Sequence, residues 1–133
     1  MPFRIAAKGT QVMLVTSRET RRWILPKGWI KKKLTPDAMA AREAFEEAGV
    51  LGRIASCPIG DYHYLKRMPD GAAIECDVAV YLLEVTRVLD TWPEMDQRER
   101  RWMRIDDAAA LISDGELVPL LRRLAQVPYP AAL

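Results

Sequence analysis

Short apolar and β-branched runs, separated by polar turns, open the chain. Residues 11–17 and 21–26 flank a polar turn, which is the pattern of a β-hairpin. Residues 52–67 indicate one extended strand or a bent pair of strands, and residues 73–89 indicate one long central strand. Residues 100–105 form a further short strand-like run. The pattern therefore predicts a sheet of several strands.

Helical signals interrupt and then follow these strands. Thr35 and Pro36 suit the N-cap and first position of a helix, and Gly49 suits the left-handed position after a helix end. The sequence thus predicts a helix over residues 36–48. Two more helices are predicted over residues 106–113 and 117–126. This order of elements predicts an α+β fold in which helices flank a mixed β-sheet.

The helix predicted over residues 36–48 holds three glutamates, Glu43, Glu46 and Glu47. At about 100° per residue their carboxylates share one face, and small apolar residues occupy the opposite side. We therefore expect an apolar side against the sheet and an acidic side in front. Like charges one turn apart repel, and the C-terminal half of a helix disfavours anions. The face is thus either a solvated acidic surface or a site for a divalent metal ion.

Length and composition limit the class of protein. The 133 residues predict a single domain, 1–133, with residues 127–133 as a loose C-terminal tail. A formal net charge of +2 is too small to indicate nucleic-acid binding. Cys57 and Cys76 lie in apolar-rich segments and are predicted to be reduced core residues. We see no signal peptide and no run of about 18 apolar residues, so a cytoplasmic protein outside the membrane is expected.

Residues 28–50 resemble the signature of the Nudix hydrolases, G-x5-E-x7-R-E-U-x-E-E-x-G-U, in which U is aliphatic. The residues at matching positions are Gly28, Arg42, Glu43, Ala44, Glu46, Glu47, Gly49 and Val50. Leu34 replaces the first glutamate of the pattern. In the family that glutamate supports the loop and pairs with the arginine. Arg42 therefore needs another partner, which is either Glu46 or a substrate phosphate.

Residues 3–115 look most like the Nudix branch that hydrolyses diphosphoinositol polyphosphates and diadenosine polyphosphates. The resemblance implies an α/β/α sandwich, the Nudix fold, with the catalytic helix at about residues 36–48. It also implies a pyrophosphohydrolase that uses Mg²⁺ or Mn²⁺ to hydrolyse a diphosphate bond.

The resemblance assigns roles to the three glutamates of the helix. Glu43 and Glu47 are implied to be the principal metal ligands, Glu46 a supporting ligand, and one of the three the catalytic base. A further acidic ligand from outside the helix is expected among three candidates, Glu75, Glu94 and Glu99.

The loop that leads into the helix is rich in lysine. The residues predicted to bind the substrate are Lys27, Gly28, Lys31, Lys32, Lys33 and Arg42. The alternative for the lysines is an exposed, solvated loop. The expected partner is a polyphosphorylated small molecule. Other nucleoside diphosphate derivatives, RNA 5′ ends, or a catalytically weak nucleotide-binding module are alternatives, although no aromatic-interleaved basic stripe favours nucleic acid.

Overall fold

The computed structural model describes residues 1–27 and 34–126. Within them the main sheet has six strands: β1 (Pro2–Ala6), β2 (Gly9–Thr16), β3 (Trp23–Ile24), β4 (Val50–Ile54), β7 (Leu83–Val88) and β8 (Arg100–Arg104). The strand order is β3-β2-β1-β7-β4, and β8 also pairs with β2. β1 and β7 run parallel, whereas the other neighbours are antiparallel. The predicted mixed sheet and the predicted β2–β3 hairpin are both confirmed.

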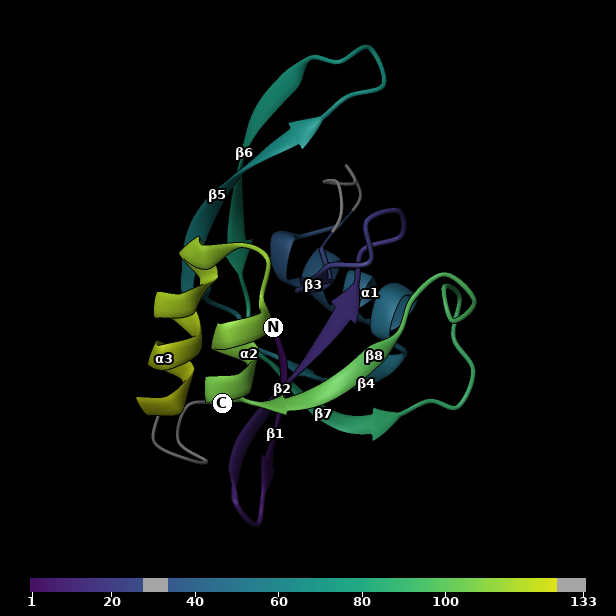
Figure 1. The fold of residues 1–133 in the computed structure, drawn as a ribbon. Coiled ribbons are helices and arrows are strands. Elements are labelled where there is room, and N and C mark those ends of the chain that lie inside the picture. Colours follow the sequence, from purple (N-terminus) through teal and green to yellow (C-terminus); the bar gives the residue numbers. More distant parts are fainter. Residues whose placement is uncertain (28–33, 127–133) are drawn as a thin grey trace.

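Helices cover both faces of this sheet (Figure 1). They are α1 (Pro36–Ala48), α2 (Ile105–Leu111), a short 3₁₀ turn η1 (Gly115–Leu117) and α3 (Val118–Gln126). Successive side chains of β2 point to opposite faces, so Val12 and Leu14 pack in the cluster with α2 and α3. Met13 and Val15 pack in the cluster with α1. The fold is therefore the predicted α/β/α sandwich.

The prediction of a helix over residues 36–48 is confirmed at both ends. Gly49 follows the helix with a φ of 65°, the left-handed conformation that favours glycine. Thr35 occupies the N-cap position, but its side chain makes no hydrogen bond to the helix backbone. Its hydroxyl donates instead to the Asp37 carboxylate at 2.5 Å. The later helices begin and end within two residues of their predicted bounds.

The prediction of one central strand over residues 73–89 is wrong. The chain forms β6 (Ala73–Val80) and then β7, which belong to different sheets. The carbonyl of Val80 accepts from Ile59 in the smaller sheet, whereas the N–H of Leu83 donates to Met1 in the main sheet. A β-prone run without a turn residue does not reveal where a strand changes its pairing partner.

The same change of sheet divides residues 52–67. Their first part belongs to β4, and the second part forms β5 (Gly60–Arg67). β5 and β6 pair as an antiparallel hairpin that extends away from the main sheet (Figure 1). Of the two predicted alternatives, the pair of strands is therefore correct.

The two cysteines are free thiols, but neither is a core residue. Cys57 is exposed, and Cys76 on β6 is only partly buried. The hairpin that carries Cys76 has no helix layer over its outer half, so an apolar-rich sequence there does not imply burial. None of the helices in the described part of the chain is long and apolar enough to cross a membrane.

Candidate active site

Two of the three glutamates of α1 point into the protein. Glu47 is 2% exposed and Glu43 is 8% exposed, whereas Glu46 is only partly buried. Ala44 and Ala48 lie on the same buried side. The expectation that all three carboxylates form an outward acidic face is therefore wrong for Glu43 and Glu47. The residues between β7 and β8, which we call the β7–β8 loop (residues 89–99), contact this end of α1.

The carboxyl group of Glu43 lies close enough to that of Glu47 to affect its ionisation. Burial disfavours the charged form of Glu47 and raises its pKa from 4.5 to about 9. The positive charge of Arg98 opposes this shift, and the nearby carboxylates of Glu43 and Glu94 add to it. In the absence of a metal ion, this carboxyl pair therefore holds a proton at neutral pH.

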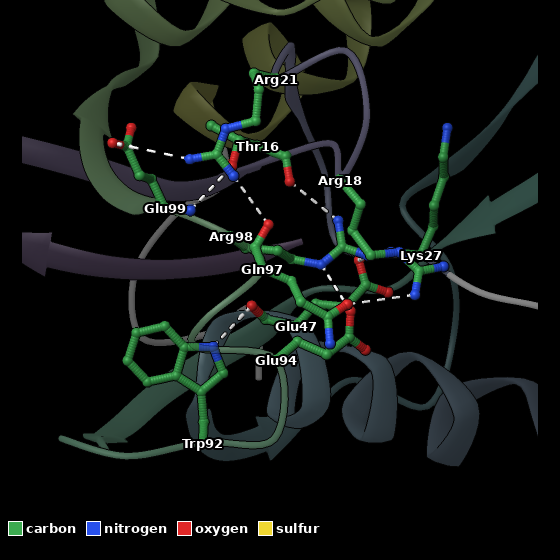
Figure 2. A network of polar contacts seen from close by, with 10 residues as sticks. All are labelled: Thr16, Arg18, Arg21, Lys27, Glu47, Trp92, Glu94, Gln97, Arg98 and Glu99. Atoms are coloured by element: carbon green, nitrogen blue, oxygen red, sulfur yellow. Dashed lines mark hydrogen bonds and ion pairs between the residues drawn. The ribbon is translucent and has the colours of Figure 1, made fainter.

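Arg98 connects Glu47 to the β7–β8 loop and to β2 (Figure 2). Its guanidinium donates to Glu94 Oε1 at 2.8 Å and to the carbonyl of Thr16 at 3.0 Å. The remaining nitrogen, Nη2, lies 3.4 Å from Glu47 Oε1. Only 8% of the Arg98 side chain is exposed, so this cation is fixed inside the wall of the site.

Glu94 is the candidate outside the helix that the structure brings to the carboxyl pair, because Arg98 links it to Glu47. Glu99 faces away, since its side chain is 64% exposed and lies 4.0 Å from Arg21. Glu75 is exposed on β6. The sequence analysis missed Arg98, because nothing in the local pattern distinguishes it from the other arginines of residues 98–104.

Lys27 lies at the edge of the same site. Its backbone N–H donates to Glu47 Oε1 at 3.4 Å, and its ammonium lies 5.7 Å from the centre of the Tyr62 ring. Burial lowers the pKa of Lys27, and the charges of Asp114 and Glu47 partly offset this shift. The lysine predicted to bind phosphate is therefore held beside the carboxyl pair by its backbone.

A cavity of about 360 Å³ borders Glu43 and Lys27. Its lining is mainly apolar: Pro26, Leu34, Pro36, Met39, Ala40, Val78, Ala79 and Tyr81, with Lys27, Glu43 and Asp77 as the charged members. A second, more open cavity of about 390 Å³ lies on the other side of Lys27. Among the described residues, its charged lining consists of Arg22, Lys27, Glu75, Asp114 and Glu116, so carboxylates and cations are mixed there.

The family profile of the NUDIX domain matches residues 3–124. The chain belongs to this family. Nudix hydrolase 12, mitochondrial, of Arabidopsis thaliana is 34% identical over 104 residues, which are 76% of this chain and 51% of that protein. Diphosphoinositol polyphosphate phosphohydrolase 3-beta of Bos taurus is 30% identical over 112 residues, which are 83% of this chain and 64% of that protein. The chain thus spans about half the length of the plant relative.

The solved structure of a C. elegans Ap4A hydrolase binary complex has the same fold. It superposes with a TM-score of 0.67 and covers 94% of this chain and 90% of that chain. The sequence identity is 19%, so this likeness concerns the Nudix fold alone.

The Nudix signature residues divide into two groups in the structure. Arg42 pairs with Glu46 across one helical turn, with Arg42 Nε 2.9 Å from Glu46 Oε1. Of the two partners expected for Arg42 in the absence of the family glutamate at position 34, the structure therefore shows Glu46. The glutamates Glu43 and Glu47 form the buried pair. Gly28 and the lysines 31–33 lie outside the described residues.

A divalent ion suits the buried pair, although a three-ligand cluster is absent from the described part of the chain. Glu46 Oε1 is paired with Arg42, so Glu43 and Glu47 are the two glutamates of α1 that lie buried beside each other. Mg²⁺ often takes only one or two protein carboxylates and completes its shell with phosphate oxygens and water. Burial and the carboxyl groups of Glu43 and Glu94 raise the pKa of Glu47, and the guanidinium of Arg98 offsets this only in part, so added positive charge would favour the ionised form.

Proposed function

We propose that this Nudix domain hydrolyses a diphosphate bond in a polyphosphorylated small molecule, with Mg²⁺ or Mn²⁺ as cofactor. The observation that carries the proposal is the burial of Glu43 and Glu47, two neighbouring carboxyl groups at the signature positions of the family. Nudix hydrolases generally use divalent metal ions. A solvated acidic face would leave these carboxyl groups in water, whereas here burial leaves them short of positive charge.

In this proposal the three glutamates of α1 have different catalytic roles. Glu43 and Glu47 would hold the metal ion, which neutralises phosphate oxygens and lowers the pKa of the attacking water. Glu46 has a supporting role, and one of the three glutamates orients the water or accepts its proton. Arg98 holds Glu47 and Glu94 in place from the loop side. The metal ion would be held by the ionised carboxylates, so its binding would favour the deprotonated form of Glu47.

Basic residues would bind the rest of the phosphate chain. Lys27 and Arg42 are the described members of this set, and Lys27 borders both cavities. Gly28, Lys31, Lys32, Lys33 and Arg42 complete the set proposed to bind the substrate. Lysine ammonium groups on flexible stems suit several phosphates, since they act as adaptable point charges.

Two substrate types are supported by different observations. The names of the Bos taurus and other mammalian relatives favour a diphosphoinositol polyphosphate. The apolar cavity beside Glu43 favours a substrate with a nucleobase, such as a diadenosine polyphosphate, because a planar base can fill apolar space that an inositol bearing many phosphates cannot. The mixed charges of the second cavity give a polyphosphorylated ring little advantage.

A substrate panel tests the proposal. Diadenosine tetraphosphate, a diphosphoinositol polyphosphate, a nucleoside diphosphate sugar and capped RNA would each be incubated with the protein and Mg²⁺ or Mn²⁺. We expect hydrolysis of a diphosphate bond in one of the first two, and none in the presence of a chelator. Binding without turnover would indicate a nucleotide-binding module, and turnover of capped RNA alone would indicate an RNA 5′-end hydrolase.

A further inference from the structure

The C-terminal end of α1 is held from outside the helix. The last carbonyls of a helix lack partners within it and need other donors. Here the carbonyl of Phe45 accepts from Gly49, and that of Glu46 accepts from the Glu94 N–H at 3.1 Å. The indole N–H of Trp92 donates to the carbonyl of Glu47 at 3.0 Å. Arg100 Nη1 donates to the carbonyl of Ala48 at 2.9 Å.

Three of these four donors come from the β7–β8 loop or from Arg100 directly after it. The loop therefore caps the helix turn that holds Glu46 and Glu47. Arg100 adds a positive charge at this end, which offsets the unfavourable position of anions near a helix C-terminus.

Trp92, Arg100 and Gly49 are packed directly together. The guanidinium of Arg100 lies 3.7 Å from the centre of the Trp92 ring. A Cβ added to Gly49 would lie 2.7 Å from Trp92 Cγ and 2.7 Å from Arg100 Nη1. The signature glycine is therefore required twice, for its positive φ and for the space that the ring and the guanidinium occupy.

We propose that Trp92 is a positioning residue for the metal-binding carboxyl pair, an inference that rests on the proposed function. Its indole N–H holds the backbone of Glu47, and the carboxyl group of Glu47 faces Arg98 (Figure 2). The carboxyl group of Glu43 lies beside it. If this turn frays, the two carboxyl groups separate and the metal ion loses a ligand. Groups that orient metal ligands typically change metal affinity by about 10–100-fold when they are removed.

The competing explanation is that Trp92 only stabilises the fold. The chain offers a matched control, because Trp102 on β8 is also stacked by an arginine, with Arg4 4.2 Å from its ring centre. Within the described residues, Trp102 makes no hydrogen bond to a backbone carbonyl of α1. Trp92→Phe removes the donor to Glu47, whereas Trp102→Phe makes the same chemical change without touching that bond.

The experiment is a Mn²⁺ titration of the full chain without substrate, followed by electron paramagnetic resonance of free Mn²⁺. We expect Trp92→Phe to raise the Kd for Mn²⁺ about tenfold and Trp102→Phe to leave it within about twofold. Thermal unfolding with a chelator shows whether the two variants lose comparable stability. If Trp92→Phe does not fold, the second variant replaces Trp92 with benzothienylalanine. This residue exchanges the N–H for sulfur in a ring of the same shape.

Equal Mn²⁺ affinity of the wild type and both Trp92 variants would overturn the inference. An equal loss of affinity in Trp92→Phe and Trp102→Phe would also overturn it, because packing alone would then explain the effect. A wild-type protein that does not bind Mn²⁺ would overturn the proposed function instead, so the two failures are distinguishable.

Discussion

Glu46 and Glu47 are neighbours in the same turn of α1, yet their environments differ. Glu46 pairs with Arg42 of the same helix, and the Arg42 side chain is 55% exposed. Glu47 faces Arg98, which comes from the β7–β8 loop and is 8% exposed. One step of about 100° around the helix axis takes the carboxyl group from the surface to the interior.

The difference in burial means that the two ion pairs contribute unequally to the free energy of unfolding. An exposed pair one helical turn apart contributes about 0.3–0.5 kcal/mol, because water and salt screen it. A buried pair loses much more when one partner is removed, because the other charge stays buried without compensation. The metal site is therefore expected to depend on the tertiary pair and to tolerate changes in the local pair.

Replacing the two arginines by glutamine is expected to give the largest contrast. Arg98→Gln leaves Glu94 without its buried cation and removes the hydrogen bond to the carbonyl of Thr16, so we expect a loss of about 3 kcal/mol in the free energy of unfolding. Arg42→Gln should cost less than about 0.5 kcal/mol. Urea unfolding of both variants with a chelator measures the difference. Similar losses in the two variants would contradict the comparison.

The glutamates should show the same contrast in catalysis. Glu47→Gln and Glu43→Gln remove groups of the buried pair, and each should lower kcat at least 100-fold, about 2.7 kcal/mol of transition-state stabilisation. Glu46→Gln changes the more exposed pair. Its decrease in kcat should be at least tenfold smaller than the decrease caused by either Glu43→Gln or Glu47→Gln. Steady-state kinetics with Mg²⁺ test this, and circular dichroism checks that the variants fold. Near-normal turnover of Glu43→Gln and Glu47→Gln would refute the proposed site.

The buried pair also predicts an unusual pH dependence of stability in the absence of metal. Burial raises the pKa of Glu47 from 4.5 to about 9, so between these values the folded protein binds a proton that the unfolded chain releases. The stabilisation of the folded protein by this proton is fully present below pH 4.5 and is lost as the pH rises through about 9. Unfolding of the wild type between pH 5 and 9 with a chelator should therefore show falling stability relative to Glu47→Gln. A constant difference between the two proteins would exclude the raised pKa.

Leu34→Glu is expected to have the smallest effect. It restores the family glutamate and offers Arg42 a second carboxylate, but Arg42 already pairs with Glu46. We expect activity equal to or higher than that of the wild type, and a change in stability within about 0.5 kcal/mol. Because Leu34 also lines the apolar cavity, a collapse of activity would show that its packing there matters more than the partner of Arg42.

Much of this fold followed from local sequence signals. Pro36 and Gly49 set the ends of α1 because one restricts φ and the other allows a positive φ. The short β-branched runs and the order of elements predicted a mixed sheet between helices. The spacing of the Nudix signature identified Glu43, Glu46 and Glu47 as a group, since the helical repeat alone brings them to one side.

Only the tertiary structure decided where the strands change partner and which glutamates are buried. Residues 73–89 carry one β-prone pattern without a Gly, Pro, Asn or Ser to mark a turn, so nothing local marks the passage from β6 to β7. The burial of Glu47 depends on Trp92 and Arg98, which lie 45 and 51 positions further along the chain. Hydrogen bonds and ion pairs over such separations depend on how the loop packs on the helix, and the helical repeat contains no information about that packing.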